Sequence, residues 1–224
     1  YVILDWFQVY TYDRTTVNLG TAWKEVDYPA FPEEESGGGP IGQESTQGAM
    51  IDPWGDPTNL GLTTDWDTDL EDRWTYYFRT KFVFDGEPTD VELIFTNLLD
   101  DGAVFWLNGQ EIFRVGMPDD EEIDYQTPAN RTVGTAGDDG YDVVVVPSDH
   151  LVQGTNVLAV EMHQTSITSS DLVFGTTIVG HFLPPGPLVL TSQPQDLSIE
   201  ELKEAVFTVT VQGNGARFQW YHNG

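Results

Sequence analysis

The stretch NLLDDGAVFWLNGQEIFR, residues 97–114, carries the clearest structural signal of the chain. Its Asn108-Gly109 dipeptide lies between two apolar runs and supplies the positive φ angles that a tight β-hairpin turn needs. Counting outward from the turn gives four cross-strand pairs: Leu107 with Gln110, Trp106 with Glu111, Phe105 with Ile112, and Val104 with Phe113. Because both faces of the hairpin are apolar, we expect it to be central in a sandwich. A second sheet would then cover one face and a long loop would partly cover the other.

Similar apolar stretches, rich in Val, Ile, Phe, Tyr and Trp, recur along the chain and are bounded by Gly, Pro, Asn or Asp. They occupy residues 1–12, 74–84, 90–98, 103–115, 141–147, 155–164 and 172–182. Such runs are typical of β-strands, and no window shows a helical period of 3.6 residues with caps. The sequence therefore predicts an all-β fold. Residues 32–73 show little strand signal, which indicates a long loop that wraps or caps a sheet.

The amino-acid composition limits the kinds of molecule that the protein can bind. Thirty-seven acidic residues against nine basic ones give a net charge of −28, which would repel nucleic acids and anionic membranes. No segment approaches the ~20 apolar residues of a membrane span, so we expect no membrane insertion. The chain has no cysteine, which excludes disulfides and thiolate chemistry. An acidic folded surface suits a saline environment or divalent cations, although plain solubility is the simpler interpretation.

A proline-rich segment divides the chain into two regions. Residues 184–187 form a Pro/Gly linker between a first domain at 1–183 and a C-terminal segment at 188–224. The C-terminal segment resembles the first strands of a bacterial immunoglobulin-like domain, with Trp220 as its core tryptophan. We expect the rest of that domain to belong to a longer natural chain. A poorly ordered tail and completion by a neighbouring molecule through strand addition are the alternatives.

Two groups of acidic and hydroxyl residues are candidates for a metal site. Asp100 and Asp101 precede the hairpin, and two adjacent carboxylates repel each other unless a cation or hydrogen-bond donors compensate, which favours Ca²⁺. The alternative is a turn in which one carboxylate caps backbone amides. Ser170 and Asp171 are turn or ion-binding residues of the same kind. The acidic run at 65–72 lacks the glycine and the bidentate glutamate of an EF-hand loop.

Five residues are candidates for ligand binding: Trp106, Trp54, Trp66, Glu161 and His163. Trp106 is either a platform on which a sugar stacks or a packing residue. Glu161 and His163 share one strand face, where acid–base or metal chemistry could be built. A third ligand at a recognisable spacing is missing, which favours a hydrogen-bonded pair that holds the following turn. The chain also lacks serine-hydrolase, zinc-protease, phosphate-loop and dinucleotide motifs, so nothing in it indicates catalysis.

Three blocks of the sequence resemble a known module: residues 76–84, 98–118 and 154–175 are similar to a galactose-binding-like jelly-roll domain of large secreted bacterial proteins. The resemblance spans roughly residues 1–183. It implies a non-catalytic jelly-roll β-sandwich, extracellular or at the cell surface, with carbohydrate as the usual ligand and calcium as the usual ion. The positions that match its pattern are Asp100, Asp101, Gly102, Asn108, Gly109, Glu161, His163, Ser170 and Asp171.

The sequence thus predicts a calcium-assisted module that binds polysaccharide or a cell-surface glycan and is not an enzyme. The predicted fold is a galactose-binding-like β-sandwich followed by a partial immunoglobulin-like segment. The alternative is a structural or adhesive subunit of an extracellular assembly, in which neighbouring copies complete the C-terminal segment. The predicted ligand rests mostly on the likeness of a fold, which does not by itself fix a ligand.

Overall fold

The computed structural model describes residues 1–13, 15–32, 34–43, 62–66, 73–119, 121–134, 136–137, 140–183, 189–198, 203–212 and 218–221. These residues belong to two compact units, Tyr1–His181 and Phe182–Gly224. No helix in the described ranges is long and apolar enough to cross a membrane.

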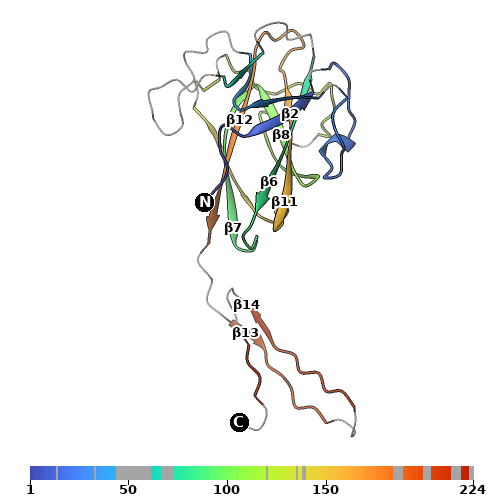
Figure 1. The fold of residues 1–224 in the computed structure, drawn as a ribbon, viewed down its shortest axis with the longest axis vertical. Coiled ribbons are helices and arrows are strands. Elements are labelled where there is room, and N and C mark those ends of the chain that lie inside the picture. Colours follow the sequence, from blue (N-terminus) through green and yellow to red (C-terminus); the bar gives the residue numbers. More distant parts are fainter. Residues whose placement is uncertain are drawn as a thin grey trace. The chain divides into compact units, whose positions relative to one another are not determined.

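The first unit consists of two packed β-sheets (Figure 1). In the first sheet the strand order among the described residues is β10 (Asp142–Pro147), β7 (Val91–Asp100), β12 (Leu172–Phe182), β4 (Ile41–Gln43) and β5 (Thr64–Asp65), with β1 (Val2–Leu4) also paired to β12. In the second sheet it is β3 (Glu34–Gly38), β2 (Val9–Asp13), β6 (Thr75–Phe84), β11 (Gly154–His163), β8 (Gly102–Leu107) and β9 (Gln110–Val115). The predicted all-β sandwich is confirmed.

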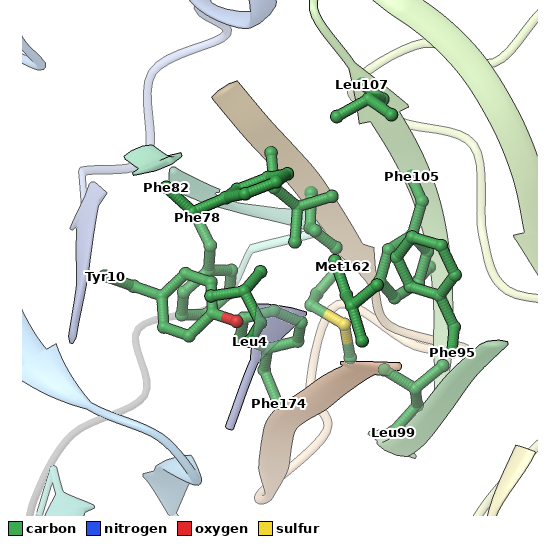
Figure 2. Close-up of a cluster of buried hydrophobic side chains, with 14 of the residues drawn as sticks. Leu4, Tyr10, Phe78, Phe82, Phe95, Leu99, Phe105, Leu107, Met162 and Phe174 are labelled. Atoms are coloured by element: carbon green, nitrogen blue, oxygen red, sulfur yellow. The ribbon is translucent and has the colours of Figure 1, made fainter. Parts of the chain in front are cut away.

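The hydrophobic core lies between these sheets, because alternate residues of each strand face the opposite sheet. The first sheet contributes side chains such as Phe95 and Phe174, and the second contributes Phe78, Phe105 and Met162. Figure 2 shows the Met162 thioether among these rings. Phe78 and Phe174 bridge the sheets at a centroid distance of 4.5 Å, so aromatic packing between facing strands is a principal stabilising contact.

The hairpin of β8 and β9 forms at the predicted turn. Asn108 and Gly109 have φ angles of 52° and 82°, and the pairs nearest the turn have the predicted register. Beyond them the prediction is wrong: a bulge shifts the register, so Phe105 lies opposite Phe113 and Val104 opposite Arg114. Since a shift of one residue reverses the face to which side chains point, Phe113 packs against the core.

The place of the hairpin in its sheet and the segments that pack on its outer face also differ from the prediction. β9 is an edge strand of the second sheet, so the hairpin is not central. Its outer face is covered by residues 19–31, which include the short 3₁₀ helix η1 (Ala22–Lys24), and by residues of the ranges 117–119 and 121–129. The described parts of the segment 32–73 instead form β3, β4 and β5. Two unpredicted segments therefore shape the surface above β6, β11 and β8.

The second unit contains one described strand pair, β13 (Val189–Ser192) with β14 (Thr210–Gln212). The larger apolar side chains in its described part are exposed, among them Leu190, Val206, Phe207 and Tyr221. Trp220, the predicted core tryptophan, is 59% exposed in the described part of the unit, with Phe207 at a centroid distance of 6.3 Å.

Candidate functional site

Three of the predicted ligand-binding residues meet on the outer face of the second sheet. β11 pairs with β8 so that Ala159 lies opposite Trp106 and Glu161 opposite Val104, which places Trp106 and Glu161 side by side. The indole Nε1 of Trp106 donates to Glu161 Oε1 at 3.3 Å. The other carboxylate oxygen, Oε2, lies 3.7 Å from His163 Nε2. The carboxylate of Glu161 is thus positioned between an indole and an imidazole.

His163 holds a covering segment in place. Its Nδ1 lies 2.8 Å from the carbonyl oxygen of Thr127, and since a carbonyl can only accept, Nδ1 carries the proton of that bond. The Thr75 hydroxyl lies 3.2 Å from the same nitrogen and donates to the carbonyl of Tyr125 at 2.7 Å. His163 is fully buried. Its side chain therefore anchors residues 125–127 to the sheet and cannot itself reach a ligand in solvent.

Glu161 forms part of a pocket of about 210 Å³ between the two covering segments, called here the Glu161 pocket. Aromatic side chains from three segments line it: Trp23, Tyr77 and Tyr125. The rings of Trp23 and Tyr77 are 4.8 Å apart, which fixes the 3₁₀ helix above the sheet. Burial raises the pKa of the Tyr77 phenol, and the nearby Glu161 carboxylate raises it further, so this phenol stays neutral.

Polar and charged groups surround these rings. Asn18, Thr21 and Lys24 lie on one side of the pocket, and Glu122 and Asp124 on the other. Amide, hydroxyl, ammonium and carboxylate groups therefore converge on one small volume. None of these five residues was predicted as a site residue from the sequence, because their segments are brought to Glu161 by tertiary packing alone.

Trp106 is half-buried and does not present an open ring. The ammonium of Lys24 lies 3.3 Å from the ring centroid, within the range of a cation–π contact. The ring also packs against the clusters formed by both covering segments. Trp106 therefore positions Lys24 and Glu161 beside the pocket, and the packing alternative describes it better than the sugar platform.

Trp66 does not join this site. Trp66 is buried in the core, where its ring stacks on Tyr76 and Phe78 at 5.8 Å and 6.1 Å, so it offers no surface to a ligand. The prediction that Trp66 binds a ligand is therefore corrected: Trp66 packs in the core, because the inward face of β6 supplies aromatic partners. Trp54 lies outside the described residues.

The carboxylate of Asp101 accepts hydrogen bonds from two distant segments. Its Oδ1 accepts from the amide of Val133 at 2.7 Å, and its Oδ2 accepts from the amide and the hydroxyl of Thr165 at 2.8 and 2.7 Å. Asp101 is 1% exposed. It thus caps backbone amides, as the alternative to a metal site proposed, but the amides come from residues far along the chain.

The remaining candidate metal ligands lie at the same end of the sandwich. Asp100 is fully buried at the end of β7, whereas Ser170 is exposed and Asp171 is half-buried just before β12. The side chain of Gln164 donates to the carbonyl of Asp171 at 2.6 Å. Within the described ranges no three His, Asp or Glu side chains are placed to hold a metal ion together. The calcium site stays a prediction.

These observations define the class of the chain as an all-β protein whose first unit is a β-sandwich with a small polar and aromatic pocket on one outer face. No protein-family model matches the chain, and no curated protein matches it.

Solved structures that resemble the chain include three bacterial proteins. A β-glycosidase from Bacteroides vulgatus is 12% identical with a TM-score of 0.47, over 87% of this chain and 22% of that one. A glycosyl hydrolase family 2 member from Bacteroides cellulosilyticus is 11% identical with a TM-score of 0.46, over 85% and 22%. A β-glucuronidase from an uncultured Clostridium is 11% identical with a TM-score of 0.43, over 93% and 33%. The chain thus spans a third or less of the length of these proteins.

Proposed function

We propose that the first unit is a non-catalytic carbohydrate-binding module and that the Glu161 pocket holds one sugar unit of a polysaccharide or cell-surface glycan. The observation that carries the proposal is Glu161, a residue that is 8% exposed and that borders a pocket with aromatic walls. A buried carboxylate needs donors, and vicinal sugar hydroxyls supply two of them at suitable spacing. The resemblance of residues 1–183 to galactose-binding-like domains supports the same ligand class.

The shape of the pocket supports a single sugar unit. At about 210 Å³ it is smaller than the ~300–1,000 Å³ of pockets for drug-sized ligands. Tyr125 and Trp23 offer apolar surface to the C–H face of a sugar ring, while Asn18, Thr21 and Lys24 offer donors to its hydroxyls. A terminal sugar or a side branch of a glycan fits this arrangement. The proposal places the module outside the cell, where such glycans occur.

A glycan array followed by calorimetry on the best ligand tests the proposal. We expect Glu161→Gln to weaken binding by at least about tenfold, because one charge-assisted hydrogen bond to a hydroxyl is lost while the shape of the side chain is kept. Glu87→Gln removes an equal charge from an exposed position and should leave affinity within about twofold. Repeating the titration with a chelator tests whether calcium assists. Wild-type protein that binds no glycan, or equal effects of the two substitutions, would contradict the proposal.

The alternative of an assembling subunit is supported by a different observation. The second unit exposes Val206 at 71% and Phe207 at 50%, and an isolated pair of strands is marginally stable in water. Among the described residues β13 and β14 pair only with each other, and an unpaired strand edge is a site for strand addition from a neighbouring copy.

Sedimentation at several concentrations tests this alternative. If copies assemble, the average mass should rise with concentration and Phe207→Ser should suppress the rise, because it removes apolar surface from the contact. Phe7→Ser changes a comparably exposed phenylalanine of the first unit and serves as the control. A constant monomer mass across the series would exclude assembly through this edge.

A further inference from the structure

A second pocket on the outer face of the second sheet, called here the Arg79 pocket, has a different chemistry. It encloses about 340 Å³ above β2, β6 and β11. Its lining includes Thr11, Tyr28, Glu34, Arg79, Lys81 and Val157. This volume lies within the ~300–1,000 Å³ range of small-molecule sites, and it exceeds that of the Glu161 pocket.

The Arg79 pocket gathers positive charge in a protein that has little of it. Only nine of 224 residues are basic, yet Arg79 and Lys81 occupy alternate positions of β6 and therefore share its outer face. In the part of the chain that the structure describes, neither of these side chains forms an ion pair with a carboxylate. Glu34, at the rim of the pocket, is the nearby acid that acts on Arg79 electrostatically.

The guanidinium of Arg79 is buried against neutral partners. Arg79 as a whole is 6% exposed, and its guanidinium donates to the carbonyl oxygens of Glu25 at 2.7 Å and Tyr28 at 3.3 Å. Its Nε is buried and has no hydrogen-bond partner among the described residues. Burial lowers the pKa of the guanidinium, opposed by the neighbouring Tyr28 and Glu34. Among the described residues the hydrogen bonds of this cation go to carbonyl oxygens and to no carboxylate, which leaves a positive field that a bound anion would neutralise.

Tyr28 and Lys81 complete the recognition chemistry. The Tyr28 ring lies 5.3 Å from the Arg79 guanidinium and stands half-buried at the wall of the pocket. An aromatic wall suits the apolar face of a sugar ring. Lys81 is exposed, so its ammonium can approach an acidic group from the solvent side. Thr11, on β2, adds a hydroxyl to the floor.

We propose that the Arg79 pocket binds an acidic sugar unit, one that carries a carboxylate or a sulfate, and so acts as a second subsite beside the Glu161 pocket. The choice of a saccharide rests on the proposed function, whereas the preference for an acid rests on Arg79 and Lys81. Lys81 contacts the acidic group, Arg79 supplies the buried positive charge, and Tyr28 packs on the ring. A polysaccharide that contains acidic units could thereby be held by a protein of net charge −28.

The overall negative charge does not prevent such binding at physiological salt. At an ionic strength of 0.15 M the Debye length is ≈ 8 Å, so exposed carboxylates elsewhere on the surface are largely screened. Contacts inside a partly closed pocket are screened much less. The local pair of cations therefore determines the preference of the site.

The test compares oligogalacturonate with its methyl ester, which has the same sugars without the charge, by calorimetry on the full chain in 0.15 M salt. We expect the acid to bind at least about tenfold more tightly than the ester, the range of one charge-assisted contact. Lys81→Gln should remove most of that difference. Lys203→Gln, which changes an exposed lysine of the second unit, should leave the difference between acid and ester unchanged.

Glu34→Gln removes the carboxylate at the rim of the Arg79 pocket and should strengthen binding of the acidic probe by about two- to fivefold.

A sulfated galactose oligosaccharide serves as a third probe and separates the two sources of negative charge. Tight binding of either acidic probe that is lost in Lys81→Gln supports the proposal. The probe that binds more tightly shows whether the site prefers a carboxylate or a sulfate. Equal affinity for acid and ester, or equal effects of Lys81→Gln and Lys203→Gln, overturns it. Glu161→Gln distinguishes this proposal from the previous one, since it should weaken a neutral glycan yet keep the preference for acid over ester.

Discussion

Phe105→Ala is expected to lower the free energy of unfolding by about 3–5 kcal/mol, the range for truncating a buried phenylalanine. The ring is fully buried in the interior between the sheets. It stacks on Phe113 at a centroid distance of 4.3 Å and meets Phe95 at 6.0 Å and Phe174 at 6.5 Å. Its removal leaves a cavity whose walls come from β7, β9 and β12, and strands of two paired sheets can collapse onto it only in part. Urea denaturation followed by tryptophan fluorescence measures the loss.

Phe7→Ala is the matched control for this substitution. The same side chain is removed, but Phe7 is 60% exposed, so the free energy of unfolding should change by no more than about 0.5 kcal/mol. A small effect at Phe105 would mean that the stack with Phe113 does not form. Because that stack exists only with the observed bulge in the hairpin, the experiment also tests the register of β8 and β9.

Asp101→Asn is expected to lower the free energy of unfolding by about 3 kcal/mol, since hydrogen bonds to a buried charged group contribute about 1.5–3 kcal/mol each. The carboxylate joins the amides of Val133 and Thr165, which lie on segments 32 and 64 residues away in sequence. An asparagine of the same shape keeps one oxygen but turns an amide group toward the other donor. Equilibrium denaturation at neutral pH measures the change.

Asp149→Asn provides the control, because this exposed aspartate carries the same charge without a buried role. Its replacement should change stability by no more than about 0.5 kcal/mol. Adding calcium to both variants and to the wild type extends the experiment to the predicted ion site. If Asp101 were principally a calcium ligand, the loss of stability would appear only when calcium is present.

The sequence predicted the strands well, because their signals are local. The alternation in residues 74–84 and 155–164 gives β6 and β11, and the Asn108-Gly109 dipeptide gives the turn between β8 and β9. The sequence could also have predicted that Arg79 and Lys81 share one face of β6, since they are two residues apart in a strand. That these two side chains line a pocket follows only from the tertiary structure, which places Tyr28 beside them.

The candidate site was less predictable, because its parts come from segments that share no local pattern. Glu161 was recognised on its strand, but Trp23 and Tyr125, which make the walls of its pocket, come from covering segments that show no helix or strand pattern in the sequence. Trp66 stands in an acidic run and Trp106 in an apolar run, yet Trp66 is in the core and Trp106 is half-buried beside Lys24. Composition alone cannot separate a packing tryptophan from an exposed one.

By itself, the sequence determined the all-β class, the positions of the main strands and the strongly acidic surface, because hydrophobic periodicity, turn residues and charge are properties of neighbouring residues. Only the tertiary structure decided which strand lies at the edge, where the hairpin register shifts, which donors satisfy Asp101 and which side chains enclose the two pockets. These depend on contacts between residues far apart in the chain, where a shift of one residue reverses every side chain of a strand.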